Sequence, residues 1–306
     1  MADRRRLGVD LIRFARAWAA LTGLVFGLGG CADFGTLSGG HTTLWRIQGD
    51  HNVVYLLGSV HVLPASAYPV RPPLQKAFDD SQRVVFEINL DTITSRDVSE
   101  EFKRAGFYPP GDALARHVSA GTKAALQRLL PAFGTSWEKV QRFRPWFLAE
   151  LLSSRYLEAV GFREDLGVDE YFYRKAHAAH RAIEGLETLR DQARILTGFN
   201  DGQSEAYLRS TLAGLPGYAA ILGAVVRAWQ NGQTELLDQL LNEDKRSDPQ
   251  GFRLLFADRN AKWLPAIERL TRAPENVLVI VGAGHLVGHE GVVEAMRQRG
   301  YRVRQL

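Results

Sequence analysis

The chain has 306 residues, 45% of them hydrophobic, so it can bury the core of one large domain or two small ones. Its formal charge of +4 comes from 38 basic and 34 acidic residues scattered along the chain, with several arginines at the extreme N-terminus, so its composition does not indicate nucleic-acid binding. The single cysteine excludes an internal disulfide framework and a zinc site made of several thiolates, so a bound metal must be held by histidines and carboxylates.

Residues 1–30 have the pattern of a lipoprotein signal peptide. Three arginines, at positions 4–6, precede a mostly apolar stretch, 14–26, which is shorter than the roughly 20 residues that span a bilayer. The sequence Leu28-Gly29-Gly30-Cys31 resembles a lipobox, whose cysteine becomes the lipidated first residue of the mature chain. The alternative is an ordinary signal peptide with Cys31 as an incidental thiol. We expect a lipid anchor at Cys31 on the periplasmic side of the bacterial cell envelope, in the inner or the outer membrane.

Residues 31–42 are small, polar and glycine-rich, as in a flexible tether, and we expect one folded α/β domain over 43–306. Two β-prone runs, 43–48 and 53–57, are separated by a turn-rich tetrapeptide and predict a hairpin. Paired prolines then open a predicted helix that reaches about residue 81, and a compact strand follows over 84–90.

The pattern becomes predominantly helical from about 110 to 273. Seven stretches carry apolar residues at three- and four-residue spacing: 114–130, 137–160, 168–180, 191–197, 204–212, 218–230 and 234–242. A short run, 182–186, is a predicted strand, and the tail returns to a strand (277–281), a helix (290–298) and a last strand (301–304). The fold class is therefore α/β, with a mixed sheet built from N- and C-terminal segments and a large helical insertion.

Two apolar strands each run into Gly-x-x-His. The first ends in Gly58-Ser59-Val60-His61 and the second in Gly282-Ala283-Gly284-His285. Ligands of open α/β sheets bind beyond the carboxyl ends of the strands, so a glycine turn there places both histidines where a site is expected. The alternative for each histidine alone is a hydrogen-bonded packing or capping residue.

Glu87 lies inside the strand predicted over 84–90. An unpaired carboxylate is costly to bury, so this side chain needs a cation, an arginine or a metal as its partner. The alternative is that Glu87 lies at an exposed strand end.

The chain resembles the TraB/PrgY/GumN family, most closely its GumN-like bacterial branch, over residues 43–306. The resemblance rests on an ordered set of motifs: the first Gly-Ser-x-His, the strand with Glu87, residues 167–172, residues 185–188 with Gln192, Asp258-Arg259-Asn260 with Trp263, the second Gly-x-x-His, and the closing Gly300-Tyr301-Arg302-Val303.

Distant relatives in this family, the Tiki proteins, are metal-dependent peptidases. The resemblance therefore implies a hydrolase in which His61, His285 and Glu87 bind manganese, cobalt or zinc and a peptide or small carbonyl substrate is cleaved. Arg259 and Asn260 match a family pair that would orient the substrate, and Glu187 is a further acidic candidate. The competing interpretation of Arg259 is a structural partner of Glu87 or Glu187.

A second hypothesis is a binding module that captures a metal, haem or a peptide without turnover. Some relatives are associated with haem binding, and TraB and PrgY with restraint of peptide pheromones. Other histidines give weaker indications: His177 and His180 share a helical spacing that can bind metal but lie in a run typical of a solvated helix face, and His289 is separated from His285 by a glycine that breaks a common helix.

Overall fold

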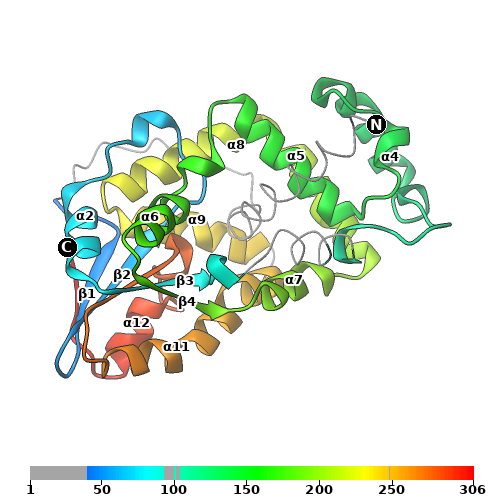
Figure 1. The fold of residues 1–306 in the computed structure, drawn as a ribbon. Helices are drawn as coiled ribbons and strands as arrows, with labels where there is room; N and C mark the ends of the chain where they lie inside the picture. Colours follow the sequence, from blue (N-terminus) through cyan, green and yellow to red (C-terminus); the bar gives the residue numbers. More distant parts are fainter. Residues whose placement is uncertain (1–39, 93–99, 101–103, 248) are drawn as a thin grey trace.

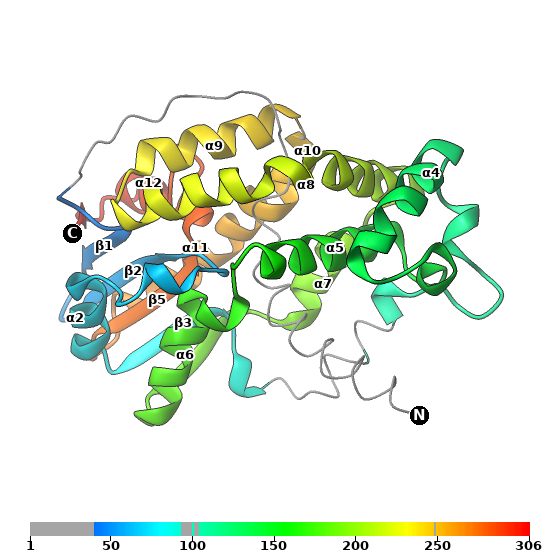
Figure 2. The ribbon, with the colours of Figure 1, turned by 90° about the horizontal axis from the view of Figure 1, so that it is seen from above.

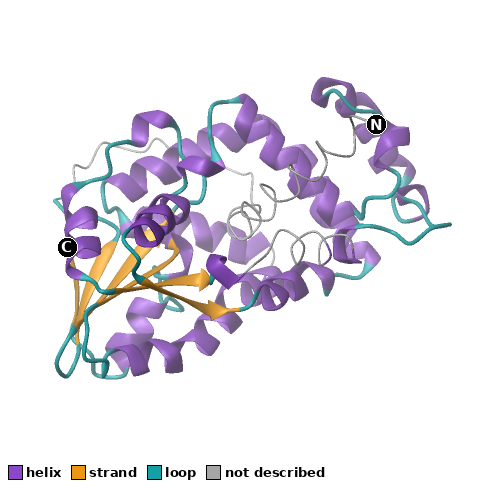
Figure 3. Cartoon of the chain, in the orientation of Figure 1, coloured by secondary structure: helices purple, strands orange, loops and turns teal. Residues whose placement is uncertain are grey.

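The computed structural model describes residues 40–92, 100, 104–247 and 249–306. The expected signal peptide, Cys31 and most of the expected tether lie outside these residues. Six strands form one sheet in the order β4-β3-β5-β2-β1-β6. Figures 1 and 3 show this sheet at one end of the molecule, with helices around it and extending away from it. The predicted α/β class, with a sheet from both chain ends and a helical insertion, is confirmed.

The sheet is antiparallel at one side and parallel at the other. β1 (Leu44–Gln48) forms the predicted hairpin with β2 (Val53–Ser59), and β6 (Val303–Gln305) pairs antiparallel with β1. β3 (Arg83–Ile88), β4 (Ala182–Glu187) and β5 (Val277–Gly282) form the parallel part together with β2. Neighbouring parallel strands end at the same edge, so the carboxyl ends of these four strands lie together.

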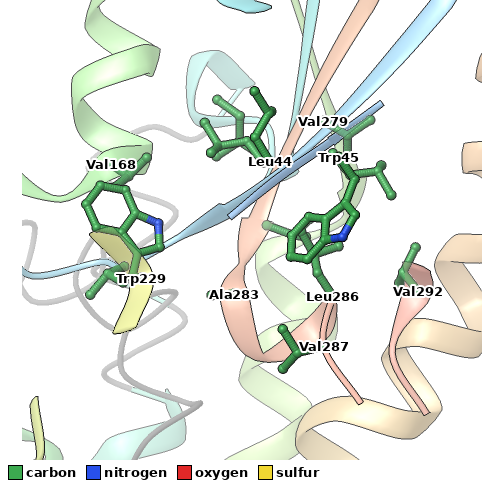
Figure 4. Packing of buried hydrophobic residues seen from close by; sticks show 14 of the residues in the cluster. Leu44, Trp45, Val168, Trp229, Val279, Ala283, Leu286, Val287 and Val292 are labelled. Atoms are coloured by element: carbon green, nitrogen blue, oxygen red, sulfur yellow. The ribbon is translucent and has the colours of Figure 1, made fainter. Parts of the chain in front are cut away.

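Helices cover both faces of the sheet. α11 (Asp258–Leu270) and α12 (Val292–Gln298) lie on one face, and α2 (Pro72–Asp80) and α6 (Val168–Ala178) lie on the other (Figures 1 and 2). β2 and β5 are buried along nearly their whole length, which explains their continuous apolar sequences. Figure 4 shows Trp229 and Val168 on one side of the strands and Trp45 with Leu286 on the other.

The helical insertion has a second hydrophobic core. It is made by α4 (Ala120–Leu129), α5 (Pro145–Ala159) and the first half of α8 (Asp201–Gln230), whereas the second half of α8 packs into the main core beside the sheet. α7 (Leu189–Thr197) precedes α8. α9 (Thr234–Ser247) and α10 (Pro249–Phe252) follow α8, and a π-helical turn, Arg253–Ala257, leads directly into α11. Because α8 contributes to both cores, it connects the insertion to the sheet.

Several predicted helix boundaries were wrong. The stretches 204–212 and 218–230 form one helix, α8, despite Pro216, because buried residues on both sides of the proline, including Leu215 and Tyr218, hold the chain helical. The stretches 114–130 and 137–160 each begin as a short 3-10 turn, and their α-helices start only at Ala120 and Pro145. The Ser119 side chain accepts a hydrogen bond from the Thr122 N–H and so caps the N-terminus of α4, which sets the first residue of this helix.

The ends of the predicted strands and of the last helix shift by a few residues. β2 continues to Ser59, β3 spans Arg83–Ile88 and the last strand is Val303–Gln305. The last helix, α12, begins at Val292 rather than 290 because Gly291, in an extended conformation, occupies its N-cap position.

Among the described residues, α8 is the one helix long and apolar enough to cross a membrane by length and composition. Its buried residues, including Leu208, Leu222 and Trp229, belong to the two cores. α8 therefore packs as a core helix of the domain.

Candidate functional site

Four parallel strands deliver the candidate residues to one edge of the sheet. His61 follows the end of β2, and His285 closes the 3-10 turn Ala283–His285 that follows β5. Glu87 lies near the end of β3, next to β5, and Glu187 is the last residue of β4. Residues from opposite ends of the chain therefore meet at the same carboxyl edge, as expected for a ligand site in this class of fold.

Gly282 lies at the centre of this group. Its N–H donates to Glu87 Oε1 at 2.8 Å. A Cβ atom at this position would lie 3.3 Å from both Glu87 Oε1 and His61 Nε2 and 3.5 Å from His285 Cδ2. The glycine thus allows two imidazoles and a carboxylate to approach the same stretch of backbone.

Arg259, at the start of α11, lies between the two glutamates. Its Nη2 is 2.6 Å from Glu87 Oε2 and 2.6 Å from Glu187 Oε1, and its Nε is 3.2 Å from both oxygens of Glu187. The side chains are only 5% exposed for Glu87 and Arg259 and 8% exposed for Glu187. Arg259 is therefore an ion-pair partner of both carboxylates at once. Burial raises the pKa of Glu187 above its usual value, although Arg259 opposes this effect.

His285 is buried and has a hydrogen-bond partner on each ring nitrogen. Nε2 lies 2.9 Å from Arg259 Nη1, and Nδ1 lies 2.7 Å from Asn260 Oδ1. A guanidinium can only donate, so Nε2 accepts and the ring proton belongs on Nδ1, which donates to the amide oxygen. Burial, with the nearby charges of Arg259 and His61, holds the pKa of His285 well below its usual value, in agreement with a neutral ring.

Asn260 and Trp263 support the cluster from α11. The Asn260 amide is fixed in turn, because its Nδ2 donates to the backbone oxygen of Glu290 at 2.9 Å. Trp263 packs against the His285 ring, with centroids 4.5 Å apart, and donates from Nε1 to Glu187 Oε2 at 3.2 Å. One helix face therefore positions a histidine, a carboxylate and the guanidinium.

His61 is oriented by Asp169 of α6. His61 Nδ1 lies 2.6 Å from Asp169 Oδ2, so Nε2 is the nitrogen that faces Gly282. Burial lowers the pKa of His61, but the charge and the hydrogen bond of Asp169 outweigh it, and the pKa is raised. Many histidines that bind a metal are paired with a carboxylate in this way, which fixes their tautomer and orientation.

Sequence reasoning assigned no role to Asp169 or Gln192. Gln192 is buried on α7, and its Nε2 donates to Glu87 Oε2 at 3.2 Å. Both residues belong to motifs of the family resemblance, 167–172 and 185–188 with Gln192, and this was the one indication of their importance in the sequence. Their contacts with His61 and Glu87 depend on how α6 and α7 pack against the edge of the sheet.

The donor atoms suit a divalent cation, but they are not arranged around a free position. Glu87 Oε1 and His285 Nε2 are 3.8 Å apart, a separation compatible with two ligands of one metal. Within the described part of the chain, no three His, Cys, Asp or Glu side chains are grouped as a ready metal site. Arg259 Nη1 donates to the lone pair of His285 Nε2, so a metal can bind this histidine nitrogen only if the arginine side chain moves away.

The remaining histidines lie elsewhere. His177, His180 and His289 are exposed, which agrees with a solvated face for the first two. His117, which carried no sequence signal, bonds Asp112 at 2.9 Å and Asp201 at 2.8 Å in the helical insertion.

Comparison with known proteins gives a family for the chain. An uncharacterized protein of Treponema pallidum (strain Nichols) is 24% identical over 268 residues, which cover 83% of this chain and 80% of the relative. No solved structure matches. The profile of the TraB/PrgY/gumN family matches residues 43–305, nearly the whole of the folded region, and the chain belongs to this family.

Proposed function

We propose that the chain is a metal-dependent hydrolase of the bacterial cell envelope that cleaves a peptide or a related small carbonyl substrate. His61, Glu87 and His285 are the proposed ligands of manganese, cobalt or zinc. The observation that carries the proposal is the approach of His61 Nε2, Glu87 Oε1 and the His285 ring to the same glycine, Gly282.

The charges of the buried cluster support a cation at this place. Glu87 and Glu187 share a single guanidinium, Arg259, so their combined negative charge exceeds what it can neutralise. Burying an uncompensated carboxylate is expensive, and the usual solutions are a proton or a metal ion. His285 is neutral in this arrangement and adds no positive charge. The raised pKa of His61 favours its protonated form, but the charge of Asp169 balances it, so an excess negative charge remains.

A bound divalent ion would supply an activated water and polarise a substrate carbonyl. The protein's own residues orient the ligands: Asp169 turns His61 Nε2 toward the site, and Asn260 holds the His285 ring with its Nε2 lone pair free of protons. Glu187 binds a proton more readily than an exposed glutamate, so it is suited to take up and return a proton during hydrolysis. Arg259 is suited to bind a substrate oxygen or carboxylate.

The proposal is tested on the purified full chain with Mn²⁺, Co²⁺ or Zn²⁺. One of these ions should raise the melting temperature and support cleavage in a pool of synthetic peptides read by mass spectrometry. At a concentration 100 times the Kd, a bound ion stabilises the folded state by about 2.7 kcal/mol. His61→Ala and His285→Ala should lose both effects, whereas the exposed His289→Ala should keep them. Equal metal responses in all three variants would contradict the proposal.

A second candidate function is capture of a metal, haem or a peptide without turnover. The arrangement favours it in one respect, since Arg259 and the Gly282 N–H already occupy His285 Nε2 and Glu87 Oε1. With these two acceptors already bonded, fewer positions are open to a reacting water. Metal-dependent stabilisation that requires His61 and His285, with no cleavage of any peptide in the pool, would favour this function.

We further propose that a lipid at Cys31 holds the domain on the periplasmic side of the membrane. The support is the lipobox-like sequence Leu28-Gly29-Gly30-Cys31 at the end of the apolar stretch.

A further inference from the structure

The guanidinium of Arg259 bonds two of the three proposed metal ligands. Its Nη1 donates to His285 Nε2 at 2.9 Å, and its Nη2 donates to Glu87 Oε2 at 2.6 Å. A metal ion bound to this histidine would need the same Nε2 lone pair. The side chain and the metal therefore compete for one acceptor atom.

Arg259 has other contacts that do not involve the proposed ligands. Its Nε and Nη2 bond Glu187, and Nη1 also donates to the backbone oxygen of Leu255 in the π-helical turn at 3.1 Å. The guanidinium carbon lies 4.7 Å from the centroid of the Trp263 ring. If Nη1 and Nη2 left His285 and Glu87, these contacts would still hold the arginine in the same wall of the site.

We propose that Arg259 is a built-in competing cation that closes the metal site, and that a metal ion enters only when its guanidinium withdraws from His285 and Glu87 toward Glu187. This inference rests on the proposed function, because it concerns the same metal ligands. It assigns the arginine a regulatory role: it keeps the carboxylate of Glu87 neutralised without metal and lowers the affinity for metal.

The test compares Co²⁺ binding by the full chain with that of the double variant Arg259→Met, Glu187→Gln. This pair of changes removes one positive and one negative charge, so the net charge of the cluster is unchanged while the competing donor is lost. The visible absorption of bound Co²⁺ reports its ligands, and a titration gives the Kd. Circular dichroism melting verifies that the variant is folded. Arg259→Lys is the second variant: it keeps the charge but lacks the fork that spans both ligands.

The double variant should bind Co²⁺ at least tenfold more tightly than the natural chain. The Kd of Arg259→Lys should lie between the Kd values of these two proteins. Adding His285→Ala to the double variant should abolish the gain. The matched control is Arg253→Met, an exposed arginine in the π-helical turn, which should leave the Kd unchanged.

The outcomes separate this inference from the proposed function. If the natural chain binds Co²⁺ through His285 and the folded double variant binds it equally or less tightly, the competition is refuted and the proposed function stands. If only the double variant binds Co²⁺, the competition is supported and metal-dependent function of the natural chain is contradicted. If neither protein binds Co²⁺, both are refuted.

Discussion

Asp169 controls which nitrogen of His61 is available at the site. Its carboxylate accepts from Nδ1, so Nε2 is the nitrogen that faces Gly282. Asn260 acts in the same way on His285, although it lies on a different helix. The nitrogen that each imidazole presents to the site is therefore set by a neighbour that is not itself a proposed metal ligand.

Asp169→Asn should weaken metal binding by about 10- to 100-fold, the usual effect of removing such a partner. The asparagine lacks the negative charge and can donate to Nδ1, which would move the ring proton to Nε2 and block the ligand atom. A Co²⁺ titration measures the change. Asp165→Asn, four residues earlier and exposed, is the matched control. An unchanged Kd in Asp169→Asn would contradict the role given to this carboxylate.

Glu150 is a second buried carboxyl, in the core of the helical insertion. Tyr207 donates to its Oε1, and its Oε2 has no hydrogen-bond partner among the described residues. Burial raises the pKa of Glu150 to about 7. The pKa of Glu150 is higher in the folded state than in the unfolded state, so the protonated carboxyl contributes to the free energy of unfolding. This contribution is complete below pH 4.5 and is lost as the pH rises through about 7.

Glu150→Gln should therefore become increasingly stabilising, relative to the natural chain, between pH 5 and pH 8. The shift corresponds to at most about 3 kcal/mol, reduced by the amide group that the variant must bury. Urea unfolding at a series of pH values measures this difference, with exposed Glu158→Gln on the same helix as the control. A stability difference that does not vary with pH would show that Glu150 is already ionised without cost.

At the level of elements, the two strands that end in Gly-x-x-His and the helices α6 and α7 were predicted from the sequence, but the way the helices pack against the strands was not. Continuous apolar runs identified β2 and β5, and a charge inside such a run identified Glu87 as a residue needing a partner. Which partner it has depends on how α7 and α11 pack, and local sequence carries no information on that contact. The same limit explains α8: Pro216 is a strong local signal for a break, and burial on both sides overrides it.

Gly167 sets the position of α6 against the first Gly-x-x-His. A Cβ atom at this residue would lie 2.2 Å from the backbone oxygen of His61, so Gly167→Ala must displace the start of α6 and with it Asp169. We expect a loss of about 1–3 kcal/mol of stability and weaker metal binding. Thermal unfolding and a Co²⁺ titration measure the two effects. Gly121→Ala in α4, where a Cβ meets nothing closer than 3.9 Å, should instead be neutral or stabilising. Similar melting temperatures for both variants would contradict this account.

At the scale of the whole molecule, the sheet brings the two ends of the chain together. β1 and β6, more than 250 residues apart, pair as Trp45 with Gln305. The predicted strands at both ends of the chain indicated a sheet built from N- and C-terminal segments, and the observed strand order confirms it. The arrangement of the insertion around a second core was not predicted, since helical periodicity defines an apolar face but not the helix it packs against.

The expected lipid anchor is tested in cells. The natural chain should incorporate radiolabelled palmitate and follow the membrane fraction, and Cys31→Ser should lose the label. An unlabelled natural chain that is released into the periplasm would contradict lipidation and favour an ordinary signal peptide.

The metal site itself is tested most directly by anomalous diffraction from crystals of the protein grown with Mn²⁺. We expect an anomalous peak from a Mn²⁺ ion bonded to His61 Nε2, Glu87 and His285 Nε2, with the Arg259 guanidinium withdrawn onto Glu187. A map from metal-treated crystals with no peak there, and with Arg259 still bonded to His285, would contradict it.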